Sequence, residues 1–130
     1  MPLVGAVPSS LTLGRSTQSG AKAMLAASAW RVVYTESQGQ PYFFISAEID
    51  LTTMAAGDSI DIQVRKQMVS GGAWTTHGQT NYIDAQPAGH LSAHIGAVAN
   101  VYGVEISMRQ TAGVLRAPNC EFFDAKFPGL

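Results

Sequence analysis

Hydrophobic and polar residues alternate with a period of two along the middle of the chain. Residues 60–68 repeat an alternation that first occurs in residues 43–51, and the turn-forming segment Met54–Asp58 separates the two. A period of two is the pattern of β-strands, whose successive side chains point to opposite faces. In the first segment, one parity contains Phe43, Ile45, Ala47, Ile49 and Leu51, and the other contains Phe44, Ser46, Glu48 and Asp50. We therefore predict two strands, with Glu48 and Asp50 on a solvent-facing side.

Further strands are predicted where β-branched and aromatic residues lie between turn formers. Val104, Ile106 and Met108 share one parity and predict a half-buried strand. The segment Ala21–Ala29 is ambiguous, because alanine favours a helix whereas its short length and its surroundings favour a short strand or an irregular edge. The predicted strands outside residues 43–68 are Ser10–Leu13, Trp30–Glu36, Ala73–Ile83, Leu91–Val98, Val101–Gln110 and Cys120–Phe127.

Seven or eight short strands without a long helix predict an all-β fold. The spacing favours an antiparallel β-sandwich of the jelly-roll or Greek-key type. A chain of 130 residues and 13.7 kDa fits one domain, which we place at residues 9–130. Residues 1–8 are apolar and contain Pro2 and Pro8, so we predict an extended N-terminal arm that lies on a neighbour.

The charge content changes the functional picture. Only 13% of the residues are Asp, Glu, Lys or Arg, about half of the ~25% typical of a soluble domain. The formal net charge is −1, with 8 basic and 9 acidic residues, so no basic excess is available for a phosphate backbone and nucleic-acid binding is not expected. No apolar run approaches the ~20 residues of a membrane span. We infer that much of the surface meets other protein.

Metal and catalytic chemistry have weak signals in the sequence. His90 and His94 are four residues apart, the helical spacing of a zinc pair, but on a strand this spacing separates them by about 13 Å; with His77 they are interpreted as loop histidines. The acidic residues Glu48, Asp50, Asp58 and Asp61 are interpreted as solvated or turn-capping groups rather than a calcium or glycosidase site. Cys120 is predicted to be a buried free thiol. No catalytic residue, metal or cofactor is predicted.

Aromatic residues offer the alternative of a ligand-stacking platform. Trp74 and Tyr82 are the candidates, since Trp74 follows the Gly71-Gly72 turn, and such rings stack on sugars in carbohydrate-binding modules. Trp74, Thr76, Thr80 and Tyr82 also share one parity, which is typical of a single core-facing side of a strand. Core or subunit contact is therefore the preferred interpretation, and glycan or receptor binding on a phage tail or spike is the alternative.

Three segments resemble small single-domain structural proteins of tailed phages and related viruses. The resemblance lies within residues 45–127, at Ile49–Val64, Ser70–Gly72 and Met108–Gly113. It implies a β-sandwich subunit that decorates or stabilises a capsid without enzymatic activity. The implied partners are the major capsid protein and copies of the chain itself in a symmetric homo-oligomer, with a trimer preferred, on the virion surface. The candidate subunit or capsid contacts are Leu3, Val4, Val7, Phe123 and Phe127.

Overall fold

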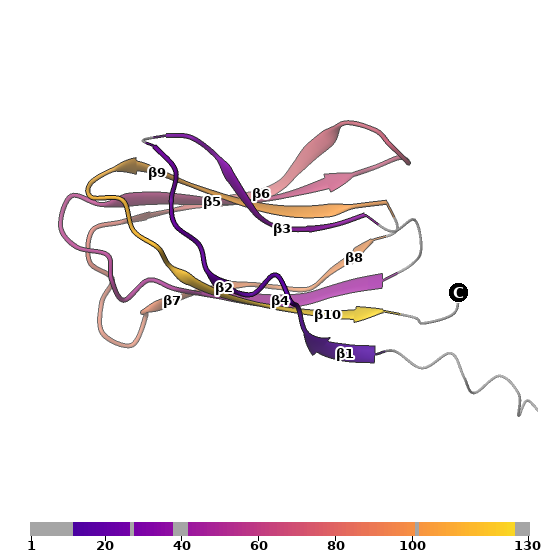
Figure 1. Ribbon diagram of the computed structural model, residues 1–130, viewed down its shortest axis with the longest axis horizontal. Coiled ribbons are helices and arrows are strands. Elements are labelled where there is room, and N and C mark those ends of the chain that lie inside the picture. The colour runs from indigo at the N-terminus through magenta and orange to yellow at the C-terminus, as the bar shows by residue number, and fades with distance from the viewer. Residues whose placement is uncertain (1–11, 27, 38–41, 101, 127–130) are drawn as a thin grey trace, which may run out of the picture.

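The computed structural model describes residues 12–26, 28–37, 42–100 and 102–126, and in this part of the chain all regular structure is β-strand. The strands form two antiparallel sheets that lie face to face (Figure 1). The strands are β1 (Thr12–Arg15), β2 (Gly20–Ala21), β3 (Arg31–Glu36), β4 (Tyr42–Asp50), β5 (Ser59–Gln67), β6 (Trp74–Ile83), β7 (Ser92–Ile95), β8 (Val98–Asn100), β9 (Val104–Ala112) and β10 (Asn119–Lys126).

The strand order is that of a jelly roll. One sheet has the order β1-β10-β4-β7, with β2 also paired to β10 and β8 also paired to β4; the other has the order β3-β9-β5-β6. If β1 with β2, and β7 with β8, are each counted as one interrupted strand, eight strands remain and the first pairs with the eighth, the second with the seventh, the third with the sixth and the fourth with the fifth. This nesting gives two four-stranded sheets. The predicted antiparallel β-sandwich is confirmed.

Most predicted strands are present with shifted ends. Of the first strand, predicted at Ser10–Leu13, the described residues Thr12 and Leu13 belong to β1, which continues to Arg15. The strand predicted at Leu91–Val98 is divided into β7 and β8 at Gly96 and Ala97. The ambiguous segment Ala21–Ala29 is an irregular edge, because after β2 it contains no further strand or helix among its described residues. It carries the chain from one sheet to the other.

The core between the sheets is centred on three aromatic rings. Tyr34 lies 5.2 Å from Phe44 and 5.1 Å from Phe122, measured between ring centroids, and all three side chains are fully buried. The Tyr34 hydroxyl donates a 2.9 Å hydrogen bond to Asp124 Oδ2 and so satisfies its polar end. Cys120 is a free, fully buried cysteine, and burial raises the pKa of its thiol to about 12. The predicted buried thiol is thus found in the core.

Two β-bulges invert the alternation on which the strand predictions were based. In β4, Phe44 and Ser46 are paired with consecutive residues of β10, which leaves Ile45 as the extra residue. Phe44 is therefore fully buried and Ile45 is half-buried, opposite to the parity of the sequence pattern. In β6, Thr76 and Gly78 pair with consecutive residues of β5, so His77 is the extra residue. A bulge inserts one residue and turns the following side chains to the other face.

The outer side of the β3-β9-β5-β6 sheet carries ion pairs with buried carboxylates instead of solvated acidic side chains. Asp61 and Glu105 are buried there, each paired with an arginine of the neighbouring strand. Arg109 Nε donates to Asp61 Oδ2 at 2.8 Å, and its guanidinium lies 4.4 Å from the centre of the Trp30 ring. The prediction of a solvated Asp61 is wrong, because cross-strand register places an arginine directly opposite it. The predicted half-buried β9 is buried on both faces over residues 104–108.

The bulge at Ile45 predicts unequal costs for two adjacent truncations. Phe44→Ala should lower the free energy of unfolding by about 4 kcal/mol, because it empties a fully buried aromatic site. Ile45→Ala should cost about 1 kcal/mol, since its side chain is only half-buried. Urea denaturation followed by circular dichroism measures both. A larger loss for Ile45→Ala than for Phe44→Ala would show that the alternation runs through β4 without a bulge.

Candidate functional site

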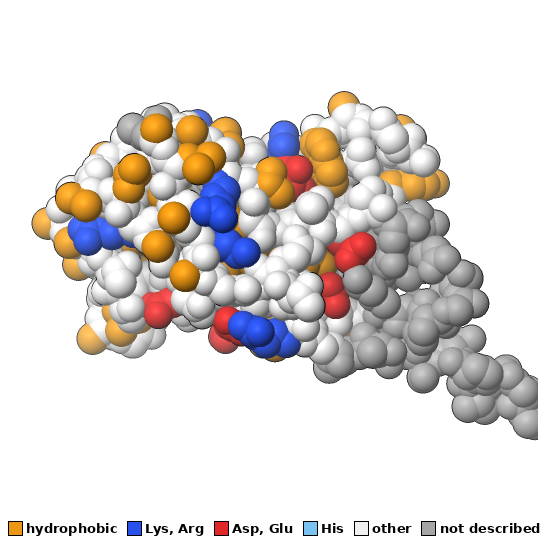
Figure 2. Space-filling view, in the orientation of Figure 1, with side chains coloured by type: hydrophobic (Ala, Val, Ile, Leu, Met, Phe, Trp, Pro, Cys, Tyr) orange, Lys and Arg blue, Asp and Glu red, His pale blue; other side chains and the backbone are white. Residues whose placement is uncertain are grey.

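Four connections gather at one end of the sandwich, which we call the loop end: residues 22–30, 51–58, 84–91 and 113–118 (Figure 1). Aliphatic side chains are exposed at this end, although solvated loops are usually polar. Figure 2 shows apolar atoms gathered there. The exposed fractions are 44% for Leu25, 59% for the adjoining Ile83, 39% for Leu91, 68% for Val114 and 47% for Leu115. A smaller group, Met68, Val69 and Tyr102, lies at the opposite end.

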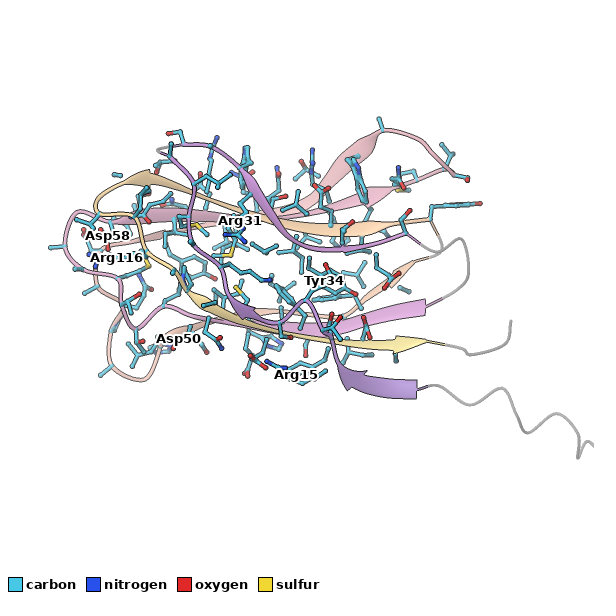
Figure 3. All side chains as sticks on the ribbon, in the orientation of Figure 1. Arg15, Arg31, Tyr34, Asp50, Asp58 and Arg116 are labelled. Carbon is cyan, nitrogen blue, oxygen red and sulfur yellow. The ribbon has the colours of Figure 1, made fainter. Side chains whose placement is uncertain are left out.

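A buried ion pair holds the loop end together. Asp58 is 1% exposed, and its Oδ2 accepts hydrogen bonds from Arg116 Nε at 2.7 Å and from the Ala55 amide at 2.9 Å. Its Oδ1 accepts from the Val114 amide at 3.2 Å. The two side chains meet between separate connections (Figure 3). The Arg116 hydrogen bond holds the pKa of the Asp58 carboxyl below its usual range, although burial opposes this shift.

Backbone bonds extend this anchor to the other connections. The Asp84 amide donates to Asp58 O at 2.8 Å, and the Gly57 amide donates to Asp84 Oδ1 at 2.8 Å. The Met24 amide donates to Arg116 O at 2.8 Å. Gly113 has a φ of +89° and lies so close to Asp58 that a Cβ would be 2.0 Å from Oδ1, so a side chain is excluded there. The exposed aliphatic groups therefore sit on a rigid base.

The buried amide of Gln110 completes this base. Its Nε2 donates to Ala112 O at 3.0 Å and to Val114 O at 2.7 Å, while its Oε1 accepts from the Arg116 amide at 2.9 Å. These bonds satisfy backbone groups in the connection that follows β9, where no neighbouring strand is available to pair with them. Sequence reasoning missed Asp58, Gln110 and Arg116 as a group, because only the fold brings them together. The aliphatic pair Val114-Leu115 beside a turn glycine was the one local signal of this surface.

One lateral edge of the sandwich is closed by the chain itself. At β3, the Gln18 side chain accepts a 2.9 Å hydrogen bond from the Thr35 amide and donates a 2.8 Å bond to the Thr35 carbonyl, as a neighbouring strand would. Arg31 Nη1 donates to Ala23 O at 2.7 Å (Figure 3). Gln18, between β1 and β2, and the segment between β2 and β3 thus cover this edge and protect it from pairing with another chain.

The opposite lateral edge is open and contains a cleft of about 290 Å³. The cleft lies between β6 of one sheet and β7 with β8 of the other. Its apolar floor is formed by the core side chains Ile62, Val64, Ala93 and Val98. Polar groups at the rim come from β6 and β7, and include His77, Gln79, Thr80 and His94. The volume is at the lower limit of the ~300–1,000 Å³ typical of small-molecule pockets.

The predicted stacking pair does not come together. Tyr82 lines the cleft and packs against the core, and burial raises the pKa of its hydroxyl. Trp74 lies on the other face of the sheet, near Gly103, because the His77 bulge separates the two residues. The prediction that Trp74, Thr76, Thr80 and Tyr82 lie on one core-facing side of the strand is therefore wrong. The bulge divides these residues between the two faces of β6, and Thr76 and Thr80 are both exposed. The glycan-stacking role stays a prediction without a common platform for the two rings.

The other predicted candidates for chemistry are dispersed. His77 and His94 both line the cleft, whereas His90 lies in the turn before β7. Asp58 caps its turn as predicted, but it is buried rather than solvated; Glu48 and Asp50 are exposed on β4, as predicted. Among the described residues, no group of three or more His, Cys, Asp or Glu is placed to hold a metal ion. The described part of the chain also contains no helix that could cross a membrane.

The predicted contact residues lie mostly outside the described residues. This is so for Leu3, Val4, Val7 and Phe127. Phe123 is half-buried on the outer side of β10, where its Cα pairs with Arg15 of β1 and Ser46 of β4. Arg15 in turn forms an ion pair with Glu121, whose pKa is lowered by this contact. Phe123 is therefore accessible to a neighbouring molecule, whereas the adjacent Phe122 belongs to the core.

Comparison with known proteins shows a likeness of fold alone. No protein-family model and no curated protein sequence matches it. Among solved structures, it is similar to VP2 of infectious bursal disease virus in the crystal structure of the VP2 subviral particle, with a TM-score of 0.51 and 10% sequence identity. What the two share is the β-sandwich fold. The match covers 99% of this chain and 39% of the VP2 chain, so this chain spans well under two-thirds of VP2.

A second solved structure, of the Gx strain of the same virus, is matched over 99% of this chain and 38% of the other, at 11% identity and a TM-score of 0.39. The identity of 10% in the first match leaves the fold as the shared property.

The Asp58 anchor predicts a dependence of stability on pH. The folded-state pKa of Asp58 lies below its ordinary value of 3.8, so the ion pair stabilises the fold fully above about pH 4 and this contribution is lost as the pH falls through the folded-state pKa. Asp58→Asn should lower the free energy of unfolding at pH 7 by about 2 kcal/mol, because Arg116 loses its charged partner. The variant should also lose less stability than the natural protein between about pH 4 and pH 2.

The matched control is Asp50→Asn, which changes an exposed aspartate whose pKa is lowered by the Thr52 amide next to it. It should cost less than about 1 kcal/mol at pH 7. Urea titrations at several pH values measure both variants. Equal losses for the two variants, or parallel pH profiles for Asp58→Asn and the natural protein, would contradict the anchoring role of Asp58.

Proposed function

We propose that this protein is a non-enzymatic structural protein of a virion, which packs against neighbouring subunits through its loop end. The observation that carries this proposal is the set of exposed aliphatic side chains on connections that a buried Asp58–Arg116 pair makes rigid. A rigid apolar surface loses little conformational entropy on binding, and its burial favours association. Connections that served only as turns would instead be polar and mobile.

The distribution of charge supports the same proposal. Eight charged residues are paired with each other in four ion pairs, Arg15–Glu121, Arg65–Glu105, Arg109–Asp61 and Arg116–Asp58. The chain has 17 charged residues in total, from 8 basic and 9 acidic ones. About half of them therefore neutralise one another within the subunit. Such a surface meets little electrostatic repulsion when many copies pack closely.

The fold supports a place in a viral shell. Over 99% of its length the chain matches part of VP2, a protein that has been crystallised as a subviral particle. Jelly-roll sandwiches are a common architecture of viral shell domains. By this analogy of fold, the present sandwich packs side by side with other subunits and its connections at either end meet neighbours. Weak contacts of this kind become strong when symmetry repeats them.

A more specific role follows from the resemblance to phage structural proteins. We propose that the chain decorates or stabilises a capsid as a symmetric homo-oligomer, preferably a trimer, and contacts the major capsid protein at the virion surface. The phage origin rests on the sequence resemblance, since the structural neighbour comes from infectious bursal disease virus.

Charge introduced at the loop end should weaken association. We expect Leu115→Lys to reduce self-association, or attachment to particles of the encoding virus, at least tenfold, because a lysine would have to be desolvated in an apolar contact. Sedimentation of the purified protein over a range of concentrations measures self-association, and co-sedimentation with particles that lack the protein measures attachment.

Val32→Lys is the matched control, since Val32 is 46% exposed and Leu115 is 47% exposed, and Val32 lies within strand β3 instead of on one of the four connections. This variant should change association less than about twofold. If the natural protein is monomeric at about 100 μM and does not attach to particles, the proposed function is wrong. Equal effects of the two substitutions would remove the loop end from the proposal.

A further inference from the structure

The open lateral edge presents a strand that is ready to pair. β6 is the edge strand of its sheet, its residues are almost all exposed, and none of residues 74–83 is charged. Natural edge strands usually carry lysine, proline or a covering segment that prevents pairing with another chain. The β3 edge has such a cover in Gln18 and the segment after it. On β6, the bulge at His77 interrupts pairing only at that residue, and residues 78–82 continue as a regular strand.

The cleft beside β6 has an apolar floor that is suited to bind aliphatic side chains of another segment. Its floor consists of Ile62, Val64, Ala93 and Val98, which are buried and belong to the core. A segment that paired with β6 would direct alternate side chains into this floor, in the manner of β-strand addition. The volume of about 290 Å³ suits a few aliphatic groups. Thr80 and Tyr82 line the side of the cleft formed by β6.

We propose that the cleft binds the N-terminal segment Met1–Pro8 of a second copy of this chain. Residues 1–14 contain no charged side chain, and Leu3 and Val7, which lie on the same face of an extended segment, supply aliphatic side chains that can pack on the floor. Pro2 and Pro8 have no amide hydrogen to donate, so pairing is confined to Leu3–Val7, a length that corresponds to residues 78–82 of β6. This inference rests on the proposed function and names the surface that receives the arm.

The position of β1 favours exchange between copies. In the order β1-β10-β4-β7, the strand that follows the arm lies at the edge opposite β7 and the cleft. Three strand spacings, about 14 Å, and the thickness of the sandwich, about 10 Å, separate the two edges. Within one subunit the arm would have to pass around the sandwich, whereas a neighbour placed beside β1 offers its cleft directly. The five residue steps from Val7 to Thr12 span at most about 18 Å, which is enough to reach the cleft of a neighbour that lies directly beside β1.

Photo-cross-linking of the full chain tests this inference. A photoreactive phenylalanine analogue replaces Ala6, and equal amounts of ¹⁵N-labelled and unlabelled protein are mixed before irradiation. We expect mixed-isotope cross-links, identified by mass spectrometry, from residue 6 to peptides that contain residues 77–82 of the adjoining strand β6. Thr80→Glu should reduce their yield at least fivefold, because it places a charge in the apolar cleft. Thr75→Glu, on the same strand and also exposed but outside the cleft, should change the yield less than twofold.

Sedimentation of the same samples separates the possible failures. If the chain associates but the cross-links reach the loop end, or join residues of one copy only, the arm does not occupy a neighbour's cleft and this inference is wrong, while the proposed function stands. Equal yields from Thr80→Glu and Thr75→Glu would also overturn it. If the chain remains monomeric, forms no mixed-isotope cross-link at any concentration and does not attach to particles, both this inference and the proposed function are wrong. Attachment to particles without such cross-links overturns this inference alone.

Discussion

The buried ion pair between Asp58 and Arg116 is the interaction on which the loop end depends. A carboxylate that is 1% exposed would be costly if it were alone, but it accepts bonds from a guanidinium and from two backbone amides. The pair joins the connection before β5 to the connection before β10, and Asp84 and Met24 attach the other two connections to it. Buried hydrogen bonds thus hold the four connections in place, and the side chains exposed on these connections can therefore be apolar.

The two lateral edges show how the jelly roll is closed on one side only. The chain passes from β2 to β3 over one edge, and Gln18 satisfies the backbone of Thr35 where no strand follows. At the other edge, β7 and β8 are short and are interrupted at Gly96 and Ala97, so they do not cover the core beside β6. The cleft therefore results from the strand lengths themselves.

Alternation was enough to predict the fold class, because a period of two over nine or ten residues is hard to accommodate in a helix. It failed where one extra residue shifts the register, at Ile45 and His77, since nothing in the local sequence marks a bulge. The separation of Trp74 from Tyr82 is a direct result. Burial of Asp58 and Asp61 was missed for a different reason: their partners, Arg116 and Arg109, are distant in sequence, and only the strand order places them opposite.

The positions of the charged residues show how the low charge content affects the surface. Four arginines are paired with four carboxylates, and three of these carboxylates, Asp58, Asp61 and Glu105, are buried. These charges neutralise one another within the subunit, where salt screens them little, and so they add little to the repulsion between molecules. The surface that remains is mostly neutral, with apolar groups on a rigid loop end and along an uncharged edge strand. Contacts built on such surfaces depend on shape and apolar burial, so they should persist over a wide range of ionic strength, as a particle exposed to changing surroundings requires.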